Sequence, residues 1–184
     1  MKVSSYLRVA ALVATIAVTA GACGGGGKVD TSAPKAAKPG APTTTLDPQA
    51  AQKAAVLAGF QGYADAYQHA LASADANSPE LPAHMTGDAL VSLRMNISGL
   101  QSAGEGLRLA DLQLNPTVVS FGPDSAVVHV CVTSAAHYFD LKTGQPRGTV
   151  PQGPSKAGFE DQLVMEGGTW KVSRETRLDS ACNA

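Results

Sequence analysis

The sequence has few aromatic residues, few charged residues and no surplus of positive charge. Aromatic residues make up 5% and charged residues 16% of its 184 positions, and 14 Lys and Arg nearly balance 15 Asp and Glu. Because binding to nucleic-acid phosphates requires a basic surface, this balance argues against nucleic acid as a partner. Apolar residues make up 44% of the chain, which is enough for the core of one domain of ordinary size.

Histidine and cysteine are also scarce. The four His and three Cys share no metal-ligand spacing, so the sequence predicts no metal site. No cofactor-binding motif and no complete catalytic signature is present. The sequence motifs therefore identify no reaction.

A long apolar run is missing as well. The run at residues 9–22 has 14 residues, whereas a membrane-spanning helix needs about 20. Lys2 and Arg8 precede it and small residues end it, which is typical of a secretory signal peptide. Residues 20–23, Ala-Gly-Ala-Cys, resemble a bacterial lipobox, in which the cysteine accepts diacylglycerol and becomes the new N-terminus. We therefore expect a signal peptide at 1–22 and a lipid anchor on Cys23, at the extracytoplasmic face of the bacterial cell membrane. The alternative is an ordinary signal peptide followed by a chance cysteine.

Residues 23–46 begin with Cys23 and are then rich in Gly, Pro, Ala and Thr. This composition cannot bury an apolar face and predicts a disordered tether. If Cys23 is lipidated, Cys131 and Cys182 remain as one pair. An oxidising extracytoplasmic space permits that pair to form a disulfide, and two buried free thiols are the alternative.

The residues from 47 onward contain the signals of a folded domain that begins with helices. Asp47 followed by Pro48 indicates a helix start, and an apolar stripe predicts that this helix reaches about residue 74. A short helical turn follows at 78–85, and a second helix begins at Thr86 or Asp88 and is stopped by Gly104 and Gly106. The stripe of the first helix consists of Val56, Phe60, Tyr63, Tyr67 and Leu71.

From residue 107 the apolar period changes to two, which predicts strands. Residues 107–121 have extended character, 126–133 alternate, and 136–141 either continue that strand or form a separate one. Residues 159–166 and 169–178 predict a hairpin across Gly167 and Gly168, with a turn of the primed type. Helices followed by antiparallel strands predict an α+β domain over 47–184, with N-terminal helices packed on one face of a curved antiparallel sheet.

Several short motifs occur in a familiar order. After the lipobox and tether come the tyrosine-bearing helix, residues 86–90 (Thr-Gly-Asp-Ala-Leu), residues 116–119 (Pro-Thr-Val-Val), Cys131 in mid-strand, a turn at 140–144, residues 168–172 (Gly-Thr-Trp-Lys-Val) and the terminal Cys182. The chain thereby resembles the secreted lipoproteins of high-GC Gram-positive bacteria that carry an NTF2-like (cystatin-like, cone-shaped) domain. Most of these are uncharacterised, so the resemblance implies a fold more than a function. Thr133 stands where an acid often lies in the family, so the role of that acid does not carry over.

The resemblance implies a pocket between the long helix and the concave sheet, and sheets of this kind often form homodimers through the open face. The candidate pocket residues are Tyr63, Tyr67, Asp111, His129 and Trp170, although a lone Trp in such a strand more often belongs to the core.

We expect a non-catalytic module that binds a small apolar ligand or an envelope protein. One alternative is a ketosteroid-isomerase-like enzyme that uses a pocket carboxylate or His together with Tyr. Another is a structural accessory subunit of an envelope complex. A cavity with an acid and a Tyr would favour the enzyme, an apolar cavity would favour ligand binding, and a filled interior would favour interaction through the sheet.

Overall fold

The computed structural model describes residues 47–148 and 153–183. The expected signal peptide, the lipidated Cys23 and the tether lie outside these residues.

The helices of the domain are α1 (Pro48–Ser73), α2 (Glu80–His84) and α3 (Gly87–Ala103). The carboxylate of Asp47 accepts a hydrogen bond from the backbone N–H of Gln49 at 3.0 Å, which satisfies one free donor at the start of α1. Gly104 ends α3 in a left-handed conformation with φ 68°, as is usual for a glycine after a helix. The predicted helices are confirmed, although Gly106 lies inside the first strand and does not end α3.

The strands are β1 (Glu105–Phe121), β2 (Ser125–Asp140), β3 (Ser155–Glu166) and β4 (Thr169–Arg177), followed by the short 3-10 helix η1 (Asp179–Cys182). They form one antiparallel sheet in the order β1-β2-β3-β4. Residues 136–140 continue β2 and are not a separate strand. Gly167 and Gly168 have φ values of 60° and 82°, as the primed hairpin turn requires.

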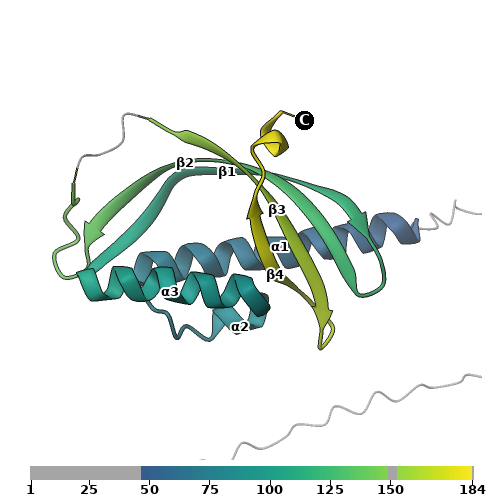
Figure 1. The fold of residues 1–184 in the computed structure, drawn as a ribbon, viewed down its shortest axis with the longest axis horizontal. Coiled ribbons are helices and arrows are strands. Elements are labelled where there is room, and N and C mark those ends of the chain that lie inside the picture. The colour runs from purple at the N-terminus through teal and green to yellow at the C-terminus, as the bar shows by residue number, and fades with distance from the viewer. Residues whose placement is uncertain (1–46, 149–152, 184) are drawn as a thin grey trace, which may run out of the picture. The chain divides into compact units, whose positions relative to one another are not determined.

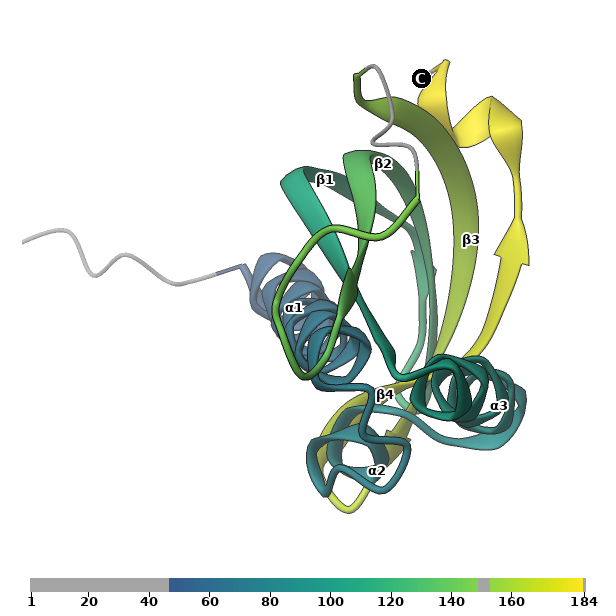
Figure 2. The same ribbon diagram turned by 90° about the vertical axis from the view of Figure 1, so that its left-hand side faces the viewer.

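The sheet is curved and arches over α1 and α3 (Figure 1). Seen end-on, α1 lies beside the concave face of the sheet and α3 lies at one end of the sheet (Figure 2). The core forms between them from the apolar stripe of α1, the inner faces of the strands and buried residues of α3 such as Leu93 and Ile97. The predicted α+β architecture, with helices packed on one face of a curved antiparallel sheet, is confirmed.

The ladders contain three register shifts, two in β1 and one in β4, and two of them decide which side chains face the cavity. In β1, Ala110 pairs with Ala135 but Gln113 pairs with Thr133, so β1 has one residue more than β2 at that point. In β4, Ser173 is the additional residue between two pairs in the β3–β4 ladder. Because side chains alternate along a strand, an additional residue exchanges the two faces beyond it.

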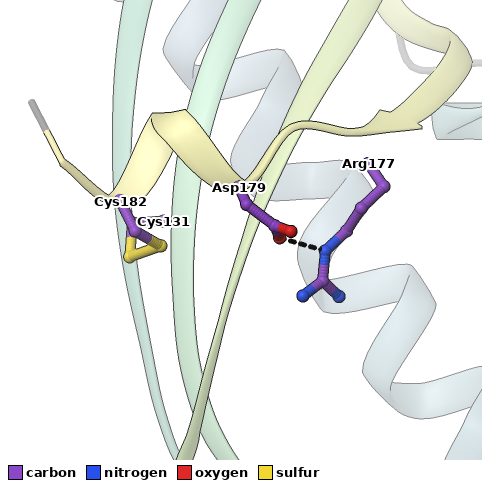
Figure 3. Close-up of a disulfide and its surroundings, with 4 residues drawn as sticks. All are labelled: Cys131, Arg177, Asp179 and Cys182. Atoms are coloured by element: carbon purple, nitrogen blue, oxygen red, sulfur yellow. Dashed lines mark hydrogen bonds and ion pairs between the residues drawn. A yellow bond between two sulfur atoms is a disulfide. The ribbon is translucent and has the colours of Figure 1, made fainter.

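The disulfide between Cys131 and Cys182 is present, with 4.7 Å between the two Cα atoms. It attaches η1 to the middle of β2 (Figure 3). Gly158 of β3 allows this close packing, because a Cβ atom there would lie 2.1 Å from the carbonyl oxygen of Leu178. Beside the disulfide, Arg177 forms an ion pair with Asp179 at 2.5 Å (Figure 3). The C-terminal segment is therefore fixed to the outer face of the sheet.

Candidate functional site

A cavity of about 180 Å³ lies between α1 and the sheet. Each of the four strands contributes to its wall, because the curvature of the sheet holds the strand centres away from the helix (Figure 2). Its lining residues are Phe60, Tyr63, Ala64, Tyr67 and Gln68 of α1, Leu109, Leu112 and Leu114 of β1, Val130, Val132 and Ser134 of β2, Ala157, Phe159 and Asp161 of β3, and Glu175 of β4.

Most of this wall is apolar, and its charged groups are all of one sign. The ionisable groups are the carboxyl groups of Asp161 and Glu175 and the phenols of Tyr63 and Tyr67. No Lys, Arg or His is among the described residues that line the cavity. The interior is thus an apolar space with a small acidic cluster in its wall.

Asp161 is the most unusual member of the cluster. Its side chain has no exposed surface, and neither carboxyl oxygen has a hydrogen-bond partner within the part of the chain that the structure describes. Burial, and then the charges of Glu175 and Glu160, raise the pKa of Asp161 from 3.8 to about 8. A carboxyl group removed from water keeps its proton because the ionised form loses hydration, so Asp161 is mostly protonated at neutral pH.

Glu175 lies directly opposite Asp161 in the β3–β4 ladder. It accepts a hydrogen bond from the hydroxyl of Tyr63 at 2.6 Å between Oη and Oε2. A carboxylate that accepts a hydrogen bond this short is held in one position. The Tyr63 hydroxyl therefore fixes Glu175 at the cavity wall, although Glu175 as a whole is an exposed residue.

The two tyrosines pack against each other, with ring centroids 5.8 Å apart. Burial and the neighbouring carboxylates raise the pKa of Tyr63 well above its ordinary value. Burial, followed by the charges of Glu175 and Asp161, raises the pKa of Tyr67 to about 12. Both phenols therefore remain neutral and can donate hydrogen bonds throughout the physiological range.

A second, smaller cavity of about 90 Å³ lies between α1 and α3. Tyr63, Tyr67 and Glu175 line both cavities and form the wall between them. The remaining lining residues of the second cavity are Met85, Asp88, Ala89, Ser92, Leu93 and Asn96. An apolar cavity thus adjoins a more polar one across the Tyr63–Glu175 hydrogen bond.

Of the five pocket candidates from the sequence, Tyr63 and Tyr67 line the cavity. The structure corrects the other three. Asp111 is exposed and has φ 52°, because the β1 bulge turns it away and brings Leu112 to the cavity in its place.

His129 lies on the opposite face of the sheet, where its Nε2 atom is 3.1 Å from Oε2 of Glu160. This follows from strict alternation along β2, since Val128 and Val130 are buried on the helix side. Trp170 is 4% exposed and belongs to the core. Trp170 packs closely against Gly59, because a Cβ atom added to Gly59 would lie 2.4 Å from the Cβ atom of Trp170. Trp170 does not line the cavity.

Sequence reasoning missed the two carboxyl groups of the site. Asp161 had a usable signal, because it alternates with Phe159 and Leu163 in the predicted strand 159–166 and so shares their inward face. Glu175 had none. Alternation from the buried Trp170 and Val172 would point Arg174 inward, and only the bulge at Ser173 exchanges it for Glu175.

Two further properties concern residues 47–148 and 153–183 only. Within them, no group of three or more His, Cys, Asp or Glu side chains is placed to hold a metal ion. No helix there is both long enough and apolar enough to cross a membrane.

No protein-family model and no curated protein matches the chain. Solved structures with a similar arrangement include the intermembrane space region of the chloroplast protein ARC6, at 15% identity and a TM-score of 0.49, which covers 73% of this chain and 98% of that one. A Nostoc punctiforme protein of unknown function with a cystatin-like fold matches at 13% identity and a TM-score of 0.38 over 66% and 88% of the two chains. An uncharacterised Caulobacter vibrioides protein with a cystatin-like fold matches at 17% identity and a TM-score of 0.36 over 71% and 93%. At this level of similarity no substrate or activity is transferable.

Proposed function

We propose that the chain is a lipid-anchored protein of the extracytoplasmic membrane surface whose folded domain binds a small, largely apolar molecule. The observation that carries the binding role is the cavity between α1 and the sheet, with a volume of about 180 Å³ and mostly apolar walls. An apolar cavity of about 150 Å³ is sufficient to admit benzene. The space therefore suits a single ring or a short branched chain, and it distinguishes this protein from a subunit with a filled interior.

The proposal is tested by thermal unfolding of the full-length chain in a mild detergent with toluene, cyclohexanol or cyclohexanone. A ligand that binds only the folded state raises the melting temperature as its concentration increases. Val132→Phe places a larger side chain into the cavity wall, so we expect it to abolish the rise. Val119→Phe is the matched control, because Val119 is 54% exposed and does not line the cavity.

If no probe raises the melting temperature of the wild-type protein, ligand binding in the cavity is contradicted. An interaction with an envelope protein or a second copy of the chain, through the outer face of the sheet, then replaces it as the proposed function. A rise that is equally large in Val132→Phe would place the binding outside the cavity.

A second candidate function is acid–base catalysis, favoured by the pKa of about 8 for Asp161. A group with a pKa near the working pH can both accept and donate a proton efficiently. In this reaction class, Asp161 takes a proton from the carbon beside a carbonyl group, and the hydroxyl of Tyr67 donates a hydrogen bond to the carbonyl oxygen as negative charge forms there.

Deuterium exchange at the α-carbon of cyclohexanone, followed by NMR in D₂O, tests this second function. The exchange rate should increase with pH up to about 8, as Asp161 ionises, and should be lost in Asp161→Asn. If the wild-type chain exchanges no faster than Asp161→Asn, the enzyme is contradicted while ligand binding stands.

A further inference from the structure

The acidic cluster of the cavity has no basic partner of its own. The nearest arginines on β4 are already engaged, because Arg174 pairs with Asp88 at 2.9 Å and Arg177 pairs with Asp179 at 2.5 Å. Neither arginine lines the cavity. The negative charge at the wall is therefore not balanced by the described side chains around it.

Asp161 adds a second, independent indication. It lines the cavity, has no exposed surface and leaves both carboxyl oxygens without a hydrogen-bond partner among the described residues. Buried polar groups are nearly always paired, and an unpaired one calls for a specific explanation. A ligand that supplies positive charge and hydrogen-bond donors would meet this unfilled requirement.

The remaining walls suit the body of such a ligand. Leucine and valine side chains line the strands, and aromatic rings of Phe60, Tyr63, Tyr67 and Phe159 surround the space. Aromatic faces attract cations as well as apolar groups. The Tyr63 hydrogen bond holds Glu175 at the boundary with the second, more polar cavity.

We infer that the ligand of this cavity is a small organic cation, an ammonium group on an apolar body. The ammonium group binds the Glu175 carboxylate, with Asp161 as the second carboxyl group across the β3–β4 ladder, and the apolar body fills the space under β1 and β2. This inference rests on the proposed ligand-binding function and specifies its ligand. An anion would be repelled by Glu175, whereas a cation brings the opposite charge to it.

Binding of a cation is linked to the ionisation of Asp161. The groups around Asp161 are Glu175 from β4 and Tyr63 and Tyr67 from α1, and the charge of Glu160 acts on it from the outer face of the sheet, while β1 and β2 contribute apolar side chains and Ser134 to the cavity. Burial and the charges of Glu175 and Glu160 disfavour the ionised form until a cation arrives. Binding should therefore release a proton, and affinity should rise by up to about 50-fold between pH 6 and pH 8 as the carboxyl group ionises.

The test compares cyclohexylmethylamine with cyclohexylmethanol, two probes with the same apolar body. The amine stays protonated over this range, since an alkylammonium group has a pKa of about 10, like a lysine side chain. Titration calorimetry of the full-length chain at pH 8 should show the amine binding at least about tenfold more tightly than the alcohol. A tenfold difference in affinity corresponds to the free energy of one pKa unit. Repeating the titration in buffers of different ionisation enthalpy should show release of up to about half a proton at pH 8 and up to about one proton at pH 6, because Asp161 is about half protonated at the higher pH.

Glu175→Gln and Asp161→Asn should each reduce the preference for the amine. Glu175→Gln retains an acceptor for the Tyr63 hydroxyl, so it removes the charge and leaves the hydrogen bond available. Glu160→Gln is the matched control, because Glu160 is adjacent to Asp161 in sequence but pairs with His129 on the outer face. It should retain the preference.

The outcomes separate this inference from the function it rests on. If the alcohol binds as tightly as the amine, the cationic ligand is overturned and the ligand-binding function stands. If neither probe binds, both are overturned. Preference for the amine that survives in Glu175→Gln also overturns the assignment of Glu175.

Discussion

Asp161 and Tyr63 show how single residues shape this site. A buried carboxyl group without a hydrogen-bond partner destabilises a fold whenever it is ionised, and Asp161 is such a group. Tyr63 has the opposite effect, because its hydroxyl satisfies and positions the carboxylate of Glu175. The pair places a protonated acid beside a fixed carboxylate in one cavity wall.

The first prediction concerns the pH dependence of stability. The pKa of Asp161 is 3.8 in an ordinary setting and about 8 in the folded chain, so between these values the folded state holds one proton more than the unfolded state. The free energy of unfolding should therefore decrease as pH rises from about 4 to about 8, by about 1.4 kcal/mol per pH unit from this group.

Urea unfolding at several pH values measures this slope. Asp161→Asn cannot ionise and should remove this contribution to the slope, although an unpaired amide would lower its stability equally at every pH. Asp124→Asn, an exposed site on the β1–β2 turn, is the control and should retain the slope. An identical slope in wild type and Asp161→Asn would show that Asp161 is not buried as described.

At the scale of elements, the helices follow from local spacing and the strand faces do not. Tyr63 and Tyr67 share one stripe of α1 because residues three and four apart lie on one side of a helix, so the sequence was sufficient to place them together. Each edge strand, by contrast, contains a bulge that moves a charged residue from one face to the other. The one in β1 turns Asp111 out of the cavity, and the one in β4 brings Glu175 in.

The second prediction concerns η1 and its attachment to β2. The disulfide closes a loop between residues separated by 51 positions, and chain entropy of the unfolded state gives it a stabilising effect of up to about 4 kcal/mol. Reduction with dithiothreitol, or replacement of both Cys131 and Cys182 with alanine, should lower the free energy of unfolding accordingly.

Denaturant unfolding with and without reductant measures the effect. The double alanine variant is its own control, because reductant should not change its stability further. If the wild-type chain unfolds at the same denaturant concentration in both conditions, the disulfide does not contribute to stability in solution.

At the scale of the whole molecule, the structure contains a folded domain that holds a cavity, and the sequence before it predicts a signal peptide with a lipid anchor. We propose that the anchor is attached at Cys23, on the basis of the lipobox-like residues 20–23. Two acyl chains on one cysteine would anchor the protein stably, because each buried methylene group contributes about 0.8 kcal/mol.

The third prediction tests this anchor. Metabolic labelling with an alkyne fatty acid in a high-GC Gram-positive host should label the wild-type chain and direct it to the membrane fraction. Cys23→Ala should lose both the label and the membrane association. Ser32→Ala, within the predicted tether, should change neither, and labelling that persists in Cys23→Ala would contradict the lipidation site.

The order of helices and strands, the helix-on-sheet class and the tyrosine stripe all follow from sequence patterns, and so does the expectation that Cys131 pairs with Cys182. The helices and strands depend on local periodicity and capping residues, which act over a few residues. The cysteine pairing follows from the number of cysteines, because two remain if Cys23 is lipidated. That Asp161 and Glu175 line the cavity while Asp111, His129 and Trp170 do not depends on the folded arrangement of the strands. Inter-strand register, with the bulges between Ala110 and Gln113 and at Ser173, settles which side chains face the cavity, and register depends on pairing between segments far apart in the chain.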